Sequence, residues 1–200
     1  PRWWNEDRSV LERARQALVR ELGPWPQILL GGEIRVTSRL LDEVDLLPSG
    51  GILPLAGSRY LLLELDRRSF GHDPTEIVHE LRITGWQPII AHPEHYPWLM
   101  EDPELLERLV GLGAHLQITG MSLLGGFGRR AEAACRDLLD RDWVTFVASD
   151  AHGATSRPPG LADAFQVVAA EWGDERAQRL FRDNPQAVVD NRLIASGLAA

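Results

Sequence analysis

Short apolar runs alternate with amphipathic stretches along the chain, a pattern typical of an α/β protein. Four of these runs are nearly continuous and predict strands at residues 60–65, 87–91, 114–119 and 143–148. A fifth β segment is predicted from a buried strand at 28–30, which runs through two glycines into the alternating residues 33–37.

The stretches between the strands show the period of helices. Residues 5–22 place their apolar side chains on one face, and Gly23-Pro24 ends this pattern. Asp73-Pro74 and Asp102-Pro103 each combine an N-cap carboxylate with a first-turn proline, so both predict helix starts. Helices are also expected from residue 128 to about 141 and over most of the C-terminal part. Strands separated by helices imply a parallel sheet, either open or closed as a barrel.

Composition narrows the class of protein. The 200 residues, 44% of them hydrophobic, suffice for one core, so we expect a single domain spanning 1–200. The net charge of −8 and the lack of a basic run argue against nucleic acid as a partner. Neither a signal peptide nor a membrane-spanning apolar stretch is visible, so we expect a cytoplasmic protein.

Residues able to bind metal recur at the predicted strand ends. Asp150 and His152 follow the strand at 143–148, and their spacing places both side chains on one side of an extended backbone. Glu33, Glu64 and His92 lie at or just past the ends of other strands. Carboxyl ends of parallel strands meet at one edge of a sheet, where ligand sites form. Oxygen and imidazole donors together predict a site for a divalent metal.

Each of these residues alone has an ordinary alternative as a surface carboxylate, an ion-pair partner or a packed imidazole. Their combination is the ligand set of a two- or three-metal hydrolase. Arg157, in a proline-rich loop after His152, could grip phosphoryl oxygens, although an ordinary surface arginine is the alternative.

Cys135 and Arg141 have the C-x-x-x-x-x-R spacing of cysteine-dependent tyrosine phosphatases. That mechanism needs a glycine-rich loop whose amides surround phosphate, whereas Asp137 and Asp140 lie between these two residues and would repel it. We therefore expect Cys135 to be a helix residue without a catalytic role.

Several strings together resemble a known family. They are GEIR at 32–35, AHPEHY at 91–96, QITGMSLLG at 117–125, ASDAH at 148–152 and TSR at 155–157. In this order they resemble the bacterial manganese-dependent tyrosine phosphatases of capsule and exopolysaccharide operons, which belong to the PHP (polymerase and histidinol phosphatase) family.

The resemblance implies a fold and a set of roles. The fold would be α/β, a PHP-type distorted (β/α)₇, TIM-like barrel. Glu33, His92, Asp150 and His152 would be metal ligands for manganese or another divalent metal (zinc, iron or magnesium), with two or three ions in the complete site. Glu64 would be an active-site carboxylate, and Arg157 would contact phosphate.

Two departures from the family pattern bear on function. His95 stands where the family usually has arginine, so an imidazole replaces one phosphate-binding cation and would act when protonated or as a proton donor. The family's N-terminal strand, which carries an H-x-H motif, is absent from these 200 residues. We therefore expect a truncated domain without the first two barrel strands, which would be inactive by itself.

The resulting functional hypothesis is a metal-dependent phosphatase that removes phosphate from protein tyrosine. By the resemblance, its partner would be a tyrosine-phosphorylated protein, in particular the tail of the capsule tyrosine kinase. The alternatives are a PHP phosphatase of a small phosphoester such as histidinol phosphate, or a non-catalytic remnant that only binds a partner. The sequence leaves the oligomeric state open.

Overall fold

The computed structural model describes residues 8–23, 25–37, 40, 53–68 and 73–195. Its centre is a five-stranded sheet in which every neighbouring pair of strands is parallel. The strands lie in chain order, β1-β2-β3-β4-β5. Their bounds are β1 Glu33–Arg35, β2 Tyr60–Glu64, β3 Gln87–Ala91, β4 His115–Thr119 and β5 Val144–Ala148.

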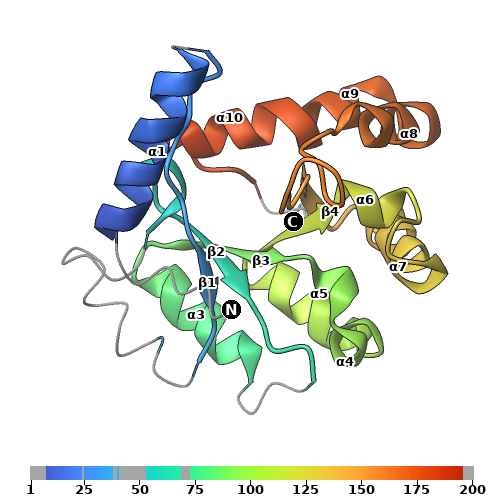
Figure 1. The fold of residues 1–200 in the computed structure, drawn as a ribbon. Coiled ribbons are helices and arrows are strands. Elements are labelled where there is room, and N and C mark those ends of the chain that lie inside the picture. Colours follow the sequence, from blue (N-terminus) through green and yellow to red (C-terminus); the bar gives the residue numbers. More distant parts are fainter. Residues whose placement is uncertain (1–7, 24, 38–39, 41–52, 69–72, 196–200) are drawn as a thin grey trace.

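Helices cover both faces of this sheet (Figure 1). On one side lie α3 and α5, and on the other lie the C-terminal helices, with α1 beside the β1 edge. The helical elements are α1 Arg8–Leu22, η2 Leu55–Gly57, α3 Pro74–Ile83, η3 Pro93–His95, α4 Pro97–Met100, α5 Pro103–Gly111, α6 Gly120–Leu123, α7 Arg129–Asp140, α8 Ala162–Trp172, α9 Asp174–Gln178, η4 Arg179–Asp183 and α10 Asn184–Val189.

The inner strands owe their continuous apolar runs to this two-sided cover. All five residues of β3 and all five of β4 are buried. Most buried apolar side chains of the described residues belong to one cluster, which joins the sheet to α3, α5 and α7. The prediction of a parallel α/β sheet is therefore confirmed.

Local signals in the sequence place the helix starts correctly. The Asp73 side chain accepts a hydrogen bond from the backbone N–H of Thr75, and the Asp102 side chain accepts one from Leu105. Each carboxylate thereby satisfies a backbone N–H that has no partner within the helix. The strands predicted at 60–65, 87–91, 114–119 and 143–148 are present to within one residue at each end.

The predicted strand at 28–30 is wrong. In place of a strand ladder, the backbone of this stretch bonds to the segment around η2: Ala56 N donates to Leu30 O at 2.7 Å, and Gly32 N donates to Leu53 O at 3.0 Å. Leu29 is 42% exposed, so the apolar run does not lie in the core. Glu33 consequently opens β1 and does not follow a strand.

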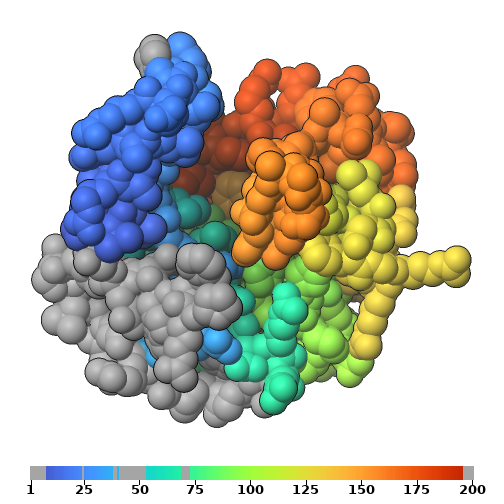
Figure 2. Space-filling view, in the orientation of Figure 1, coloured from blue at the N-terminus to red at the C-terminus, as the bar shows by residue number. Residues whose placement is uncertain are grey.

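The helix predicted at 5–22 is present as α1 over its described part, from Arg8 onward. No residue of α1 is buried, and Val10, Leu18 and Leu22 are all about half exposed. Figure 2 shows α1 bordering a hollow whose other side is the orange segment after β5. Among the described residues, no helix has the length and apolar character to cross a membrane.

Candidate metal and phosphate site

Three of the residues singled out in the sequence meet at one place. Glu33, Glu64 and His92 come from β1, from the end of β2 and from the position just after β3. One ligand atom of each lies within 4.8 Å of the others. Glu33 is the first residue of β1 and pairs with Leu62 of β2. Leu62 and Glu64 are two residues apart and lie on the same face of their strand, so the Glu33 side chain reaches the region of Glu64.

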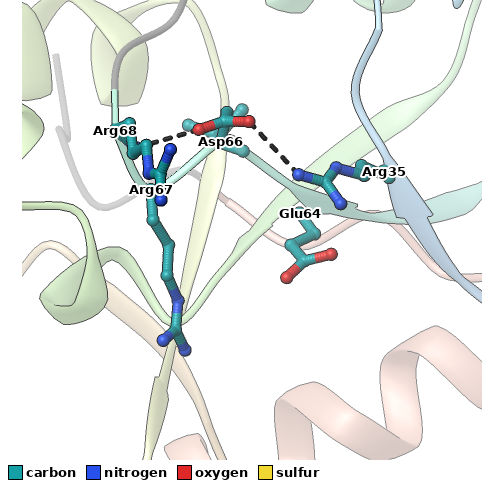
Figure 3. A pocket seen from close by; sticks show the side chains of 6 residues that line it. Arg35, Glu64, Asp66, Arg67 and Arg68 are labelled. Atoms are coloured by element: carbon teal, nitrogen blue, oxygen red, sulfur yellow. Dashed lines mark hydrogen bonds and ion pairs between the residues drawn. The ribbon is translucent and has the colours of Figure 1, made fainter. Parts of the chain in front are cut away.

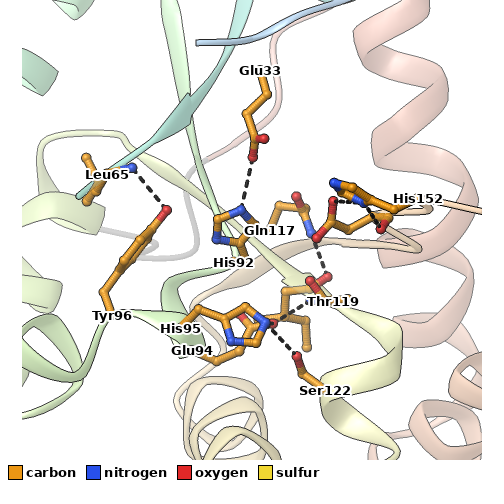
Figure 4. A network of polar contacts seen from close by, with 12 residues as sticks. Glu33, Leu65, His92, Glu94, His95, Tyr96, Gln117, Thr119, Ser122 and His152 are labelled. Atoms are coloured by element: carbon orange, nitrogen blue, oxygen red, sulfur yellow. Dashed lines mark hydrogen bonds and ion pairs between the residues drawn. The ribbon is translucent and has the colours of Figure 1, made fainter. Parts of the chain in front are cut away.

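Backbone geometry fixes His92 where its ring meets Glu33 (Figure 4). The residue has φ 37° and ψ 56°, in the left-handed region, and Pro93 follows it. Its backbone N–H donates to Gln117 O at 2.8 Å, which ties the end of β3 to β4. Its Nε2 contacts Glu33 Oε1 at 3.0 Å, while Nδ1 is buried without a hydrogen-bond partner in the described part of the chain.

The charge of His92 depends on opposing effects. Burial alone would lower its pKa, but the hydrogen bond to Glu33 and the charges of Glu33, Asp150 and Glu94 raise it above the ordinary value. Negative charge therefore surrounds the ring. A bound cation would stabilise this arrangement more than a single proton does, because it compensates several carboxylates at once.

Two aromatic residues, Tyr96 and Trp98, hold the backbone just after Glu64. The Tyr96 hydroxyl accepts from Leu65 N at 3.0 Å, and Trp98 Nε1 donates to Asp66 O at 2.9 Å. Tyr96 is fully buried and lies 5.5 Å from the His92 ring, centroid to centroid. These bonds fix Glu64 relative to His92.

Asp150, His152 and Arg157 share the loop that follows β5. Arg157 forms an ion pair with Asp150, and its backbone carbonyl accepts from His152 N at 3.0 Å. The His152 ring is turned back on the loop, with Nδ1 2.9 Å from Asp150 O. Asp150 itself has φ 48°, a left-handed conformation that an aspartate tolerates better than most residues.

This loop adjoins the three-residue group without joining it. The charge of Asp150 reaches His92, but neither Asp150 nor His152 is among the residues whose ligand atoms lie within 4.8 Å of one another. Of the five residues expected to converge on one site, Glu33, Glu64 and His92 do so. The roles of Asp150 and His152 as metal ligands stay predictions.

His95 is uncharged in this fold near neutral pH. Its pKa is lowered to about 4, first by burial and then by the positive charges of His92, Arg67 and Arg157. Its Nε2 lies 3.3 Å from Ser122 Oγ, and its ring meets Phe127 edge to face at 4.9 Å. Of the two roles considered from the sequence, the protonated cation is therefore disfavoured.

Glu94 is a buried carboxyl group that the sequence did not single out. Its side chain accepts from Thr119 N at 2.8 Å, and burial raises its pKa despite this bond. It joins the loop after β3 to the end of β4 and so supports the position of His92. Its place between Pro93 and His95 in the motif was the available signal, but its partner lies on another strand.

Cys135 takes no part in this site. It is fully buried in α7, and burial raises the pKa of its thiol far above the range in which a thiolate forms. The expectation that Cys135 is a helix residue is confirmed, and its lack of a catalytic role stays a prediction.

Comparison with known proteins identifies the family. Residues 4–190 match the model of the family described as capsular polysaccharide synthesis, CpsB/CapC. The chain belongs to the CpsB/CapC family.

Relatives in this family carry named activities. The tyrosine-protein phosphatase YwqE of Bacillus subtilis is 34% identical, over 94% of this chain and 79% of its own length. The tyrosine-protein phosphatase CpsB of Streptococcus agalactiae is 31% identical, over 84% of this chain and 70% of its own length.

A solved structure agrees with the sequence comparison. Crystal structures of YwqE from Bacillus subtilis and CpsB from Streptococcus pneumoniae are described as unique metal-dependent tyrosine phosphatases. The match has a TM-score of 0.84 at 31% identity and covers 94% of this chain and 74% of that one. The five-stranded CpsB/CapC fold described above is therefore shared with an experimentally determined structure.

Proposed function

We propose that this CpsB/CapC protein is a metal-dependent phosphatase that hydrolyses phosphotyrosine in a protein of the capsule or exopolysaccharide apparatus. The observation that carries the proposal is the convergence of Glu33, Glu64 and His92 at one edge of the sheet. The names of the relatives supply the reaction class, which the geometry alone does not specify.

The donor set fits a divalent transition metal. Two carboxylates and an imidazole are ligands that manganese, zinc and iron all accept. The His92 ring is only half satisfied by the described residues, because Nδ1 has no partner and Nε2 has only a carboxylate. A cation would replace the proton shared by His92 and Glu33, so its affinity should rise with pH.

The residues divide the work as follows. Glu33, Glu64 and His92 would hold metal, with Asp150 and His152 adding ligands for a second or third ion, and manganese is the ion we propose. Bound ions would supply Lewis acidity and an activated water. Arg157 would stabilise negative charge on the phosphoryl oxygens, and neutral His95, close to Ser122, would donate a hydrogen bond toward the leaving-group oxygen.

The proposal also covers the fold and the protein substrate. We propose that the five parallel strands are part of a PHP-type (β/α)₇ barrel, with the site at its carboxyl-terminal end. The substrate would be the phosphorylated tail of the capsule tyrosine kinase. A PHP phosphatase of a small phosphoester such as histidinol phosphate is the second candidate, and the ratio of kcat/KM for the two substrates separates them.

The test combines activity with metal content. Hydrolysis of a phosphotyrosine peptide by the full-length protein should disappear on chelation and return with Mn²⁺, and Glu64→Gln should retain less metal than the wild type by mass spectrometry. Glu80→Gln, which removes an exposed carboxylate of α3, is the matched control and should keep full metal content. Hydrolysis that survives chelation, or metal loading without hydrolysis, would overturn the proposal.

A further inference from the structure

A pocket of about 420 Å³ lies next to the candidate metal ligands. Its wall is a short segment after β2 together with one residue of β1, and Glu64 belongs both to this wall and to the metal group (Figure 3). The lining residues are Arg35, Glu64, Leu65, Asp66, Arg67 and Arg68. An anion bound at the metals would therefore be within reach of this pocket.

The segment that carries the pocket is held firmly. Leu65 N and Asp66 O are bonded to Tyr96 and Trp98, as described above, and Asp66 Oδ1 accepts from Arg68 N at 2.9 Å. Contacts therefore fix the backbone on both sides of Arg67. Its side chain starts from a defined position, which lowers the entropic cost of binding a ligand.

The three arginines of the pocket differ in their charge balance. Arg35 forms an ion pair with Asp66 at 3.2 Å. The pKa of Asp66 is lowered by the hydrogen bond from the Arg68 backbone N–H, by the bond from Arg35 and by the charges of both arginines, so both cations act on this carboxylate. Arg67 extends away from Asp66, toward the side to which the Glu64 carboxylate points. Within the described residues Arg67 has no hydrogen bond or ion pair, and its charge does not act on Asp66 as those of Arg35 and Arg68 do, so it is the least compensated of the three arginines.

The charge of Arg67 also reaches the second half of the site. The charges of Arg67 and Arg157 both act on the partly buried ring of His95. Arg157 is already neutralised by its ion pair with Asp150. A phosphoryl dianion bound next to Glu64 and His95 would therefore meet a positive charge on Arg67 that no ion pair among the described residues compensates.

We infer that Arg67 binds the phosphoryl group of the substrate, and the phosphate released from it, together with Arg157. The ligand class is a phosphomonoester dianion, and the inference rests on the proposed phosphatase function. A planar guanidinium suits this role, because it can donate two parallel hydrogen bonds to phosphoryl oxygens. The neutral His95 ring would then lie beside the phosphoryl group without supplying its charge.

The experiment compares Arg67→Ala with Arg68→Ala in the Mn²⁺-loaded protein. Both variants lose one positive charge from the same turn, so a general electrostatic effect would be equal in the two. Affinity for inorganic phosphate is measured by calorimetry, and KM and kcat for a phosphotyrosine peptide are measured in parallel. Arg67→Ala should weaken phosphate binding about tenfold and raise KM, as expected for one lost charge-assisted contact.

The control and a conservative variant make the result specific. Arg68→Ala should change phosphate affinity by less than about twofold, as for an exposed surface charge. Arg67→Lys should recover part of the lost affinity, because the charge remains but the fork does not. Equal losses in the two alanine variants, or no loss in Arg67→Ala, would overturn the inference.

A failure of the proposed function would look different. The wild type would then bind phosphate and distinguish the two variants, yet would not hydrolyse the phosphotyrosine peptide. That outcome would still support phosphate binding by Arg67.

Discussion

The histidine that opens β4 should make the fold sensitive to acid. His115 is 1% exposed and packs between the rings of Tyr60 at 5.8 Å and Phe146 at 6.0 Å. Its Nδ1 is 3.4 Å from Thr145 Oγ1, and its Nε2 is buried with no partner in the part of the chain that the structure describes. Burial, aided by the charge of Arg82, lowers its pKa to about 4.

The size of the effect follows from the two protonation states. The ring is neutral in the fold, while an unfolded chain protonates it near the ordinary value of 6.5. The associated stability is fully present above pH 6.5 and is lost as the pH falls toward 4. At about 1.4 kcal/mol per pH unit, the whole loss is on the order of 3 kcal/mol, and about 2 kcal/mol of it falls between about pH 7.5 and about pH 5.

Urea denaturation of wild type and His115→Phe at those two pH values measures this loss. Phenylalanine keeps the aromatic stack but cannot be protonated, so the variant should lose about 2 kcal/mol less on acidification. His95, whose pKa is also lowered to about 4, contributes to the loss in both proteins and cancels in the comparison. His79→Gln, which replaces an exposed histidine of α3, should behave like wild type. An unchanged pH dependence in His115→Phe would refute the reasoning.

Three further substitutions test the site and its surroundings. Tyr96→Phe removes the hydroxyl that accepts from Leu65 N, so unfolding free energy should fall by about 1–3 kcal/mol and metal titration should show weaker binding, because Glu64 loses its support. Arg157→Ala should weaken phosphate or vanadate binding about tenfold in a calorimetric titration, with little change in Tm; a large loss of Tm at constant anion affinity would assign it to structure. Cys135→Ala should keep phosphatase activity and cost about 1 kcal/mol in urea denaturation, whereas loss of activity in a folded variant would implicate the thiol.

Predictions from the sequence succeeded where a local signal also decides the structure. The strands at 87–91 and 114–119 are apolar runs buried on both faces, and a capping carboxylate such as Asp73 bonds only two residues away. The stretch at 28–30 failed because its backbone partners, Leu53 and Ala56, belong to a distant segment that offers bonds of a different geometry. The apolar composition of residues 28–30 does not indicate which backbone segment they bond to.

The same distinction holds for the site. Glu64 and His92 could be predicted because parallel strands bring their ends to one edge of the sheet. Glu33 opens β1 and reaches the same place through the register of β1 with β2, which the sequence does not give. Glu94 and Tyr96 could not be assigned a function, since each bonds to a backbone N–H in another part of the chain. Glu94 bonds to Thr119 at the end of β4, and Tyr96 bonds to Leu65 just after β2. The proposed role of Arg67 in phosphate binding depends on the ion pairs of the arginines around it, which only the structure shows.

The strict chain order of the strands has a consequence for how such proteins can diverge. Within the described sheet, the carboxylates of the metal group come from β1 and β2, whereas the loop at 150–157 leaves β5, on the opposite margin. Residues 153–156 of that loop lie between the proposed ligand His152 and Arg157, and mutations there can accumulate without altering the strands that position the metal group. Grafting residues 153–156 from a relative with a different substrate preference should therefore transfer that preference while the recipient keeps its own metal affinity.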